Sequence, residues 1–314
     1  MRRLAVIHHR FKDWVPALRE AAPELSIRGW HPQGLAEADW EWLSEAEGLF
    51  CWKLPPGLIG RMPCLNWIQN SGAGVDHLLH HPELPPHIPI TRADGGFGFW
   101  MARYVCAHLL VEAQRIQACR EAQDQGQWDS ALLPENLTGQ VALILGFGRI
   151  GRQIGRAFRE LGLQVHGIVR TPREDEEFPL HGPDGLPEWL PKARVLVLAA
   201  PSTNETHSMV DEPLLRCGHP DLLLVNVGRG ELVSLDALRS ALDRDRLGRA
   251  VLDVFPEEPL PDHHWLWSHP KVTITPHHSG PSTPAQLIPD IQNNLDRFAR
   301  GEAVQDVVNR LRGY

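Results

Sequence analysis

The 314-residue sequence predicts an α/β fold made of two doubly wound domains. The first observation is a glycine-rich turn at residues 146–151, which directly follows an apolar run near the middle of the chain. The second is a series of continuous apolar runs after this turn, separated by helical stretches, as in strands buried on both faces of a parallel sheet. The third is a weaker alternation of the same kind in the first half. A chain of this length normally forms two domains, and we expect a smaller one before the glycine turn.

The expected strands follow from the apolar runs in chain order. Short runs separated by helical or proline-rich stretches predict the strands of the smaller domain at residues 4–7, 25–27, 48–52, 67–69 and 88–91. Longer runs predict a six-stranded second domain, with strands at residues 141–145, 164–169, 195–198, 222–225, 250–252 and 272–275.

Apolar residues at helical spacing predict three helices that define the domain organisation, at residues 99–123, 150–161 and 284–300. If the last helix returns to the first domain, the chain crosses between the domains twice. The expected domains are then residues 1–97 with 284–314, and residues 98–283. This is a Rossmann domain inserted into a smaller flavodoxin-like domain, and a cleft between them that opens and closes is the expected active site.

The glycine turn has the pattern of a dinucleotide-binding loop. Gly146 permits a tight turn, Gly148 lets the backbone approach a pyrophosphate, and Gly151 allows close packing of helix on strand. The intervening residues Phe147, Arg149 and Ile150 belong to the same expected cofactor site, because the helix N-terminus faces the phosphates. A glycine turn used for packing alone is the alternative, but the order of strand, turn, helix and strand favours a nucleotide.

The end of the next strand indicates which nicotinamide cofactor is used. An NAD-selective domain places a carboxylate about 20 residues after the glycine loop. Here the chain has Arg170, Thr171 and Arg173 instead. These side chains are suited to a 2′-phosphate, so NADP(H) is expected to be preferred and NAD(H) remains possible. The alternative is that both arginines are solvated and pair with the acidic run at residues 174–177, which is itself expected to be a solvated loop.

Composition excludes several classes of function. The net charge of −8 and pI near 6.1 argue against a nucleic-acid-binding protein. No segment reaches the length of a membrane span, and the N-terminus is expected to form a strand and no signal peptide, so a cytoplasmic protein is expected. Small-molecule chemistry is the class that remains.

Cysteine and histidine usage predicts neither disulfides nor a metal site. The five cysteines have no C-x-x-C spacing and are expected to be reduced core residues, at positions 51, 64, 106, 119 and 217. Four histidine pairs lack the spacing of a zinc site, at residues 8–9, 80–81, 263–264 and 277–278. All of these histidines except His277 are interpreted as turn or surface residues.

Three reactive side chains follow strands of the second domain, where ligands of parallel sheets bind. These are Arg229, Asp253 and His277. Taken one at a time, each has a simple structural explanation: Arg229 as a surface charge, Asp253 as a helix cap and His277 as a turn residue. Together they fit the reduction of a carbonyl in a small anionic substrate: an arginine holds a carboxylate through paired hydrogen bonds, and a histidine donates the proton. Glu258 is the expected partner of the histidine, and Glu257 is the alternative.

These motifs closely resemble those of the D-isomer-specific 2-hydroxyacid dehydrogenases, over essentially the whole chain. The matching segments are Gly146-x-Gly148-x-x-Gly151, Gly228-Arg229-Gly230, Leu252-Asp253-Val254-Phe255, Glu258-Pro259-Leu260-Pro261 and Thr275-Pro276-His277. The resemblance implies that Arg229 binds substrate, that Glu258 pairs with His277, and that Asp253 lies near the nicotinamide carboxamide. Pro201 and Val227 complete the expected cofactor contacts.

The resemblance also implies a substrate loop in the first domain and a homodimer. Gly72-Ala73-Gly74-Val75-Asp76 resembles the loop whose amides receive the substrate carboxylate, so Ala73 and Gly74 are assigned to substrate. The first domain would therefore bind the small 2-keto or 2-hydroxy acid, and the Rossmann domain the cofactor.

The most similar subgroup is the glyoxylate/hydroxypyruvate reductase A type. The matching segments are Cys51-Trp52, Asp94-Gly95-Gly96-x-Gly98 and Arg312-Gly313-Tyr314. Arg103 stands where relatives commonly carry a glutamate, close to the aromatic residues Phe97, Phe99 and Trp100. Trp52 and these aromatic residues either line the substrate pocket or belong to the core.

The leading hypothesis is an NADPH-dependent reductase of a short 2-keto acid. A reductase of bulkier or aromatic 2-keto acids is the alternative within the same chemistry. A cofactor-sensing binding protein without turnover is the alternative from another class, and the intact set of Arg229, Glu258 and His277 argues against it.

Overall fold

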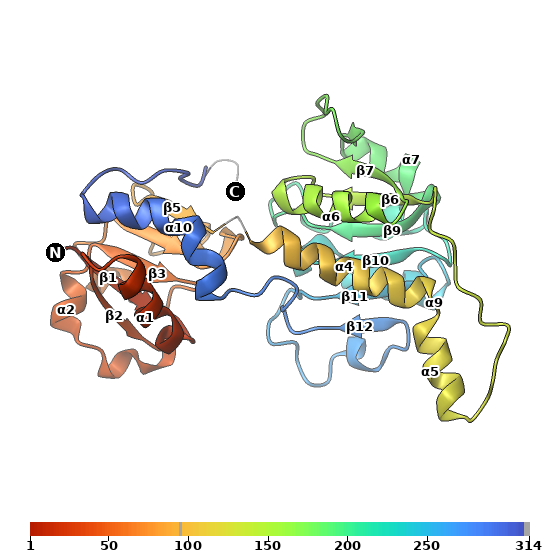
Figure 1. Ribbon diagram of the computed structural model, residues 1–314, viewed down its shortest axis with the longest axis horizontal. Helices are drawn as coiled ribbons and strands as arrows, with labels where there is room; N and C mark the ends of the chain where they lie inside the picture. Colours follow the sequence, from red (N-terminus) through yellow and green to blue (C-terminus); the bar gives the residue numbers. More distant parts are fainter. Residues whose placement is uncertain (94–95, 311–314) are drawn as a thin grey trace. The chain divides into compact units, whose positions relative to one another are not determined.

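The structure, a computed structural model, describes residues 1–93 and 96–310. It divides into two compact units (Figure 1). Unit 1 comprises Met1–Phe97 together with the chain from Pro281 onward, and unit 2 comprises Gly98–Gly280. The second crossing therefore falls between Gly280 and Pro281 rather than after residue 283.

Unit 1 contains a five-stranded parallel sheet in the order β2-β1-β3-β4-β5, which is the flavodoxin-like order. Its strands are β1 (Arg3–Ile7), β2 (Ser26–Trp30), β3 (Gly48–Cys51), β4 (Trp67–Asn70) and β5 (Ile90–Arg92). Its helices are α1 (Phe11–Ala21), α2 (Trp40–Ser44), α3 (Asp76–Leu79) and α10 (Pro284–Ala299). Helix α10 packs against α1, so the end of the chain completes the first unit.

Unit 2 contains a seven-stranded parallel sheet in the order β12-β11-β10-β9-β6-β7-β8. Its strands are β6 (Val141–Leu145), β7 (Gln164–Ile168), β8 (Leu180–His181), β9 (Ala193–Leu198), β10 (Leu223–Asn226), β11 (Arg249–Leu252) and β12 (Val272–Ile274). The Rossmann fold is confirmed, but the expected count of six strands was wrong. The additional strand, β8, has two residues and so no periodicity by which it could be recognised.

The helices of unit 2 lie over this sheet, except α5, which extends away from it (Figure 1). They are α4 (Phe97–Ala113), α5 (Ile116–Asp124), α6 (Arg149–Glu160), α7 (Leu186–Trp189), α8 (Glu212–Leu215) and α9 (Leu235–Asp243). The single helix expected over residues 99–123 was wrong, because Arg115 has a left-handed φ of 53° and separates α4 from α5. None of the described residues of α5 is buried.

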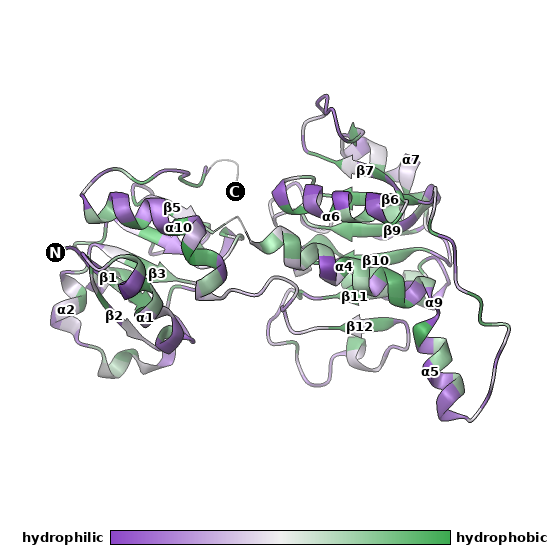
Figure 2. Ribbon diagram, in the orientation of Figure 1, coloured by the Kyte–Doolittle hydropathy of each residue, from purple (hydrophilic) through white to green (hydrophobic). Residues whose placement is uncertain are grey.

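The core of unit 2 contains a cluster of mainly aliphatic side chains from the strands and from the helices and loops that pack on them. The central strands are accordingly green, the colour of hydrophobic residues, in Figure 2. Strand β9 is buried along its whole length, including Arg194 near its start. The Arg194 guanidinium forms two hydrogen bonds with Glu135, of 2.7 and 2.9 Å. Burial opposes ionisation of Glu135, but hydrogen bonds from Arg194 and Gln140 outweigh it, and the pKa of Glu135 is lowered. This pair makes a charged residue compatible with the core.

His8 is buried, which corrects its interpretation as a turn or surface residue. Its side chain follows β1 and is only 3 % exposed. The backbone N–H of Arg10 donates to Nδ1 of His8 at 3.0 Å, and Trp14 lies edge-on to the ring at 5.8 Å between centroids. Burial, with the nearby charges of His9 and Arg10, lowers the pKa of His8 to about 4. The ring is therefore neutral at physiological pH.

The thiols are also distributed differently from the expectation of a wholly buried set. Cys51 is buried, and burial raises its pKa to about 12. Cys64 and Cys119 are exposed. Among the described residues, no helix combines the length and the apolar character that a membrane crossing needs.

Candidate active site

The glycine turn lies at the carboxyl end of β6, where the strand order of unit 2 reverses. Gly146 has a φ of 92°, and a Cβ there would lie 2.4 Å from the backbone nitrogen of Ala200. A Cβ on Gly151 would lie 2.2 Å from the carbonyl oxygen of Gly146. A Cβ on Gly148, in contrast, would meet no atom of the described residues within 4 Å. Packing therefore requires two of the glycines, and the third leaves open space at the turn.

This open space adjoins the N-terminus of α6, which begins at Arg149. Gly148 occupies the N-cap and no side chain caps this end of the helix. Backbone N–H groups and the positive end of the helix dipole fit a pyrophosphate. Arg149 is exposed and Ile150 is half-buried beside it. Phe147 is 2 % exposed and packs against Phe178, so its side chain belongs to the core.

The residues expected beside the adenosine ribose follow β7 and are exposed. They are Arg170, Thr171 and Arg173. The Arg170 guanidinium forms an ion pair with Glu205 at 2.5 Å. The sequence-based prediction did not include Glu205, which is 35 residues further along the chain.

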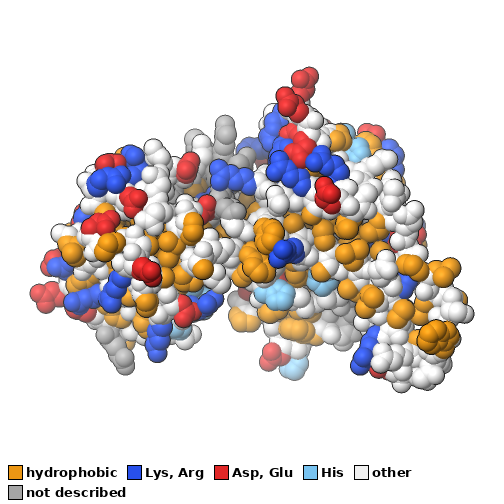
Figure 3. Space-filling view, in the orientation of Figure 1, with side chains coloured by type: hydrophobic (Ala, Val, Ile, Leu, Met, Phe, Trp, Pro, Cys, Tyr) orange, Lys and Arg blue, Asp and Glu red, His pale blue; other side chains and the backbone are white. Residues whose placement is uncertain are grey.

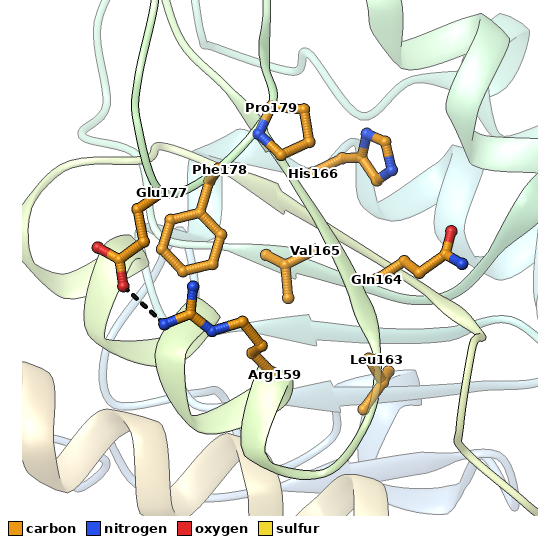
Figure 4. A pocket seen from close by; sticks show the side chains of 8 residues that line it. All are labelled: Arg159, Leu163, Gln164, Val165, His166, Glu177, Phe178 and Pro179. Atoms are coloured by element: carbon orange, nitrogen blue, oxygen red, sulfur yellow. Dashed lines mark hydrogen bonds and ion pairs between the residues drawn. The ribbon is translucent and has the colours of Figure 1, made fainter.

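Two members of the acidic run at residues 174–177 are bound to α6, which corrects the expectation of a solvated loop. Asp175 pairs with Arg152, and Glu177 accepts hydrogen bonds from Arg156 and Arg159 at 2.9 Å each. The bond from Arg152 holds the pKa of Asp175 well below its ordinary value, and the bond from Arg156 lowers the pKa of Glu177 to about 2. Figure 3 shows the resulting cluster of red and blue side chains over α6, and Figure 4 shows the pair of Arg159 and Glu177.

Pro201 and Val227 lie at the same edge of the sheet as the glycine turn. Pro201 follows β9, and its carbonyl accepts a hydrogen bond from the Thr206 hydroxyl at 2.7 Å. Val227 directly follows β10, and its N–H donates to the carbonyl oxygen of Leu198 at 3.0 Å. Both therefore occupy strand ends that border a ligand in parallel sheets.

His277 and Glu258 are in direct contact. Nδ1 of His277 lies 2.9 Å from Oε2 of Glu258, while Oε1 of Glu258 accepts a hydrogen bond from the N–H of Phe255 at 3.0 Å. His277 has a φ of 52°, and its own N–H donates to the carbonyl oxygen of Asp253 at 2.9 Å. Backbone contacts thus hold both partners, and Glu258 rather than Glu257 faces the imidazole. In this arrangement Nδ1 is the imidazole nitrogen that faces the carboxylate of Glu258.

Asp253 supports the loop that carries His277. It is fully buried and accepts hydrogen bonds from the Thr275 hydroxyl at 2.6 Å and from the N–H groups of His278 and Ser279 at 2.9 and 3.0 Å. Tyr104 bonds to the same Thr275 hydroxyl at 2.7 Å, and burial raises its pKa. These contacts use both carboxylate oxygens of Asp253. Its expected contact with the nicotinamide carboxamide stays a prediction.

Arg229 lies in the turn after β10, and its backbone is fixed on both sides. Asn226 Nδ2 donates to the carbonyl oxygen of Arg229 at 2.9 Å. A Cβ on the next residue, Gly230, would lie 2.0 Å from the carbonyl carbon of Phe255, so only glycine fits there. Nη1 of Arg229 donates to the carbonyl oxygen of Gly228 at 2.7 Å. Arg229 thus lies at the same edge of the sheet as His277 and the glycine turn.

Unit 1 carries the residues expected to bind substrate. Trp52 follows β3 and the loop with Ala73 and Gly74 follows β4, at the carboxyl edge of this sheet. The Trp52 ring covers the loop, because a Cβ on Gly72 would lie 2.2 Å from it. Buried Asn70 donates hydrogen bonds to the carbonyl oxygens of Gly72 and Gly74 at 2.9 and 2.8 Å. The sequence analysis did not single out Asn70, although an asparagine at the end of an expected strand is a signal that could have indicated it.

The aromatic residues considered for the substrate pocket have different surroundings. Phe97 is 4 % exposed, whereas Phe99 and Trp100 are 47 and 43 % exposed. The Arg103 guanidinium stacks on Phe99 at 3.8 Å from the ring centroid. Two segments of the subgroup resemblance extend outside the described residues. The segment 94–98 does so at residues 94–95, and the segment 312–314 does so entirely.

Comparison with known proteins identifies the family. Residues 106–279 match the family model of the D-isomer specific 2-hydroxyacid dehydrogenase NAD binding domain. The glyoxylate/hydroxypyruvate reductase A of Escherichia fergusonii is 32 % identical over 96 % of each chain. The protein of the same name from Photorhabdus laumondii is 30 % identical over 98 % of this chain and 99 % of that one.

Solved structures agree with this result. A D-isomer specific 2-hydroxyacid dehydrogenase from Xanthobacter autotrophicus, in complex with NADPH and MES, has a TM-score of 0.89 at 31 % identity and covers 100 % of this chain and 99 % of its own. An NADPH-dependent glyoxylate/hydroxypyruvate reductase from Sinorhizobium meliloti, in complex with NADP and sulfate, has a TM-score of 0.88 at 27 % identity and full coverage of both chains.

The family match includes the glycine turn, Arg229, Asp253 and His277, and the relatives extend it to nearly the whole chain. The chain therefore belongs to the D-isomer-specific 2-hydroxyacid dehydrogenase family and is an NAD(P)-dependent oxidoreductase that reduces 2-keto acids.

Proposed function

We propose that this enzyme reduces a short 2-keto acid such as glyoxylate or hydroxypyruvate, with NADPH as the preferred cofactor. The product is the 2-hydroxy acid, of D configuration where it is chiral. The observation that carries the proposal is the contact of His277 with Glu258, because this pair supplies a positioned proton donor. The relatives named glyoxylate/hydroxypyruvate reductase A support the choice of a short substrate.

Each step of the reduction has an assigned group. NADPH, when bound, supplies the hydride that the carbonyl carbon gains. His277 donates the proton that the carbonyl oxygen gains, from Nε2, and Glu258 stabilises the imidazolium through Nδ1. Arg229 binds the substrate carboxylate through paired hydrogen bonds, which a planar guanidinium forms and an ammonium does not. Trp52 and the amides of Ala73 and Gly74 are assigned to the same substrate.

The preference for NADPH is supported by the charges at the end of β7. Asp175 and Glu177 pair with arginines of α6, so these two carboxylates of the acidic run do not neutralise Arg170 and Arg173. Arg170 and Arg173 are exposed at the position where a 2′-phosphate is expected. The complexes of two solved relatives with NADPH and NADP support the same cofactor.

Steady-state kinetics with variants test this function. His277→Ala is expected to lower turnover by about 10²–10⁴-fold without weakening NADPH binding, as the loss of a general acid does. Arg229→Lys is expected to impair reduction of a 2-keto acid but not of its neutral amide. Near-normal turnover by folded His277→Ala, or equal wild-type activity on acid and amide, would contradict the assignments.

A panel of 2-keto acids tests the substrate class. Glyoxylate and hydroxypyruvate are expected to give a higher kcat/KM than phenylpyruvate. The opposite order would establish the alternative, a reductase of bulkier 2-keto acids. A lower KM for NADPH than for NADH is expected in the same assay, and equal values would contradict the cofactor preference.

We also propose that the enzyme is a cytoplasmic homodimer. Large apolar side chains are exposed on α5 and the segment that follows it, and a second copy of the chain would cover them. Ile116, Trp128 and Leu133 are 52, 97 and 71 % exposed. Sedimentation analysis of the wild type is expected to show a dimer that Trp128→Ser and Leu133→Ser together weaken. A wild-type monomer would contradict the proposal.

A further inference from the structure

An ion pair crosses the cofactor edge of unit 2 and involves a residue to which the reaction assigns no role. Arg170 follows β7, and Glu205 lies in the segment after β9. Their side chains meet at 2.5 Å and are 52 and 54 % exposed. Glu205 is therefore accessible to solvent.

The position of this pair is defined by the strand order. Strands β7 and β9 are the two neighbours of β6, which leads into the glycine turn. A bond from the segment after β7 to the segment after β9 therefore spans the point at which the strand order reverses, where nucleotides bind in such sheets. The glycine turn also contacts the segment after β9, because a Cβ on Gly146 would lie 2.4 Å from the nitrogen of Ala200.

The nearby acidic side chains differ in whether they are free to pair with Arg170. Asp175 and Glu177 are neutralised by Arg152, Arg156 and Arg159. The side chain of Asp175 is only 10 % exposed and that of Glu177 is 23 % exposed. The carboxylate that engages Arg170 is that of Glu205, from a different segment of the chain.

We propose that Glu205 is a specificity-determining residue that competes with the 2′-phosphate of NADPH for Arg170. This inference rests on the proposed NADPH preference. Binding of NADPH exchanges the carboxylate of Glu205 for the phosphate on the Arg170 guanidinium, whereas NADH, with a 2′-hydroxyl, requires no such exchange. Glu205 consequently weakens NADPH binding and leaves NADH binding unchanged, so it narrows the preference that Arg170 creates.

Glu205→Gln tests the inference, with Glu212→Gln as the matched control. Glu212 also pairs with an exposed arginine, Arg216 at 2.7 Å, but on α8. Equilibrium binding of NADPH, NADH, 2′,5′-ADP and ADP would be measured for both variants. The loss of an exposed ion pair corresponds to about a two- to fivefold change. Glu205→Gln is therefore expected to tighten NADPH and 2′,5′-ADP by this factor, with NADH and ADP unchanged and Glu212→Gln like the wild type.

Other results would overturn the inference. Unchanged NADPH and 2′,5′-ADP affinity in Glu205→Gln would show that Glu205 does not compete. Weaker NADH binding would show instead that Glu205 accepts a hydrogen bond from the ribose. Equal tightening of ADP and 2′,5′-ADP would place the effect away from the 2′-phosphate.

Arg170→Ala separates this failure from failure of the proposed cofactor preference. If Arg170→Ala binds NADPH as the wild type does, Arg170 does not hold the phosphate, and both proposals fail. If Arg170→Ala weakens NADPH but Glu205→Gln does not tighten it, only the role of Glu205 is lost. The double variant Arg170→Ala/Glu205→Gln completes a double-mutant cycle. Without Arg170, Glu205→Gln is expected to leave NADPH affinity unchanged. Tighter NADPH binding in the double variant than in Arg170→Ala would show that Glu205 does not act by competing for Arg170.

Discussion

Glu258→Gln is expected to place a hydrogen-bond donor against His277. In the wild type, Oε1 of Glu258 accepts the N–H of Phe255 at 3.0 Å and Oε2 faces Nδ1 of His277 at 2.9 Å. The backbone N–H of Phe255 will select the oxygen of the new side-chain amide, because that N–H can only donate. The amide NH₂ group must then face Nδ1, which can accept its hydrogen bond only when Nδ1 carries no proton.

The magnitude follows from the interaction that is lost. A hydrogen bond to a charged group contributes about 1.5–3 kcal/mol, and the opposed donors add to this when the imidazolium forms. If the protonated form of His277 is destabilised by about 2–4 kcal/mol in total, the rate is expected to fall by about thirtyfold to a thousandfold. Reduction needs this protonated form, so the pH above which the rate declines is expected to be lower in the variant.

The assay is kcat/KM for a 2-keto acid across pH, with NADPH saturating. Glu257→Gln is the matched control, because it removes the same charge from the neighbouring, exposed residue. Wild-type rates and an unchanged pH profile in Glu258→Gln would refute this description of the pair. An equal loss in Glu257→Gln would assign the effect to general electrostatics.

Three further outcomes are expected. His8→Asn keeps an acceptor for the backbone N–H but has no ring that can be protonated. The pKa of His8 is lowered from 6.5 to about 4 in the folded protein, so protonation favours the unfolded wild type as the pH falls between these values. In urea unfolding near pH 5, the wild type should therefore lose about 2 kcal/mol of stability relative to this variant. Glu135→Gln leaves the buried Arg194 without its carboxylate and should lower the unfolding free energy by about 2–3 kcal/mol. Gly146→Ala should destabilise the fold by about 1–3 kcal/mol, whereas Gly148→Ala, whose Cβ meets no atom, should leave stability unchanged and weaken NADPH binding in titration. The first expectation is contradicted if the stabilities of His8→Asn and the wild type change in parallel with pH. The second is contradicted by unchanged stability in Glu135→Gln, and the third by full NADPH affinity in Gly148→Ala.

The sequence predicted most of the fold because buried parallel strands appear as continuous apolar runs. It failed where a structural change has no side-chain signature. Arg115 adopts a left-handed conformation between two helical stretches with neither glycine nor proline at the break. Strand β8 has only Leu180 and His181, too few residues to show a pattern.

The candidate site was predictable to the extent that it lies at strand ends. Arg229, Asp253 and His277 all follow strands of one parallel sheet, and their location at one edge follows from topology. Contacts between distant surface segments could not be derived in this way, and the pair of Arg170 with Glu205 is one of them. The binding of the acidic run to α6 had a detectable signal, because arginines at helical spacing at 152, 156 and 159 form one basic face.

The shortness of the two outermost strands of unit 2 has a consequence for how the protein behaves at high concentration. An exposed sheet edge offers N–H and C=O groups with which a strand of another molecule can pair, and this is a common start of aggregation. Strand β8 has two residues and lies between Pro179 and Pro183, while β12 has three and lies between Pro270 and Pro276. Proline has no N–H to extend such pairing. Both edges of the larger sheet are therefore protected against strand addition, so the expected self-association does not use strand pairing and relies on side chains such as Trp128 and Leu133.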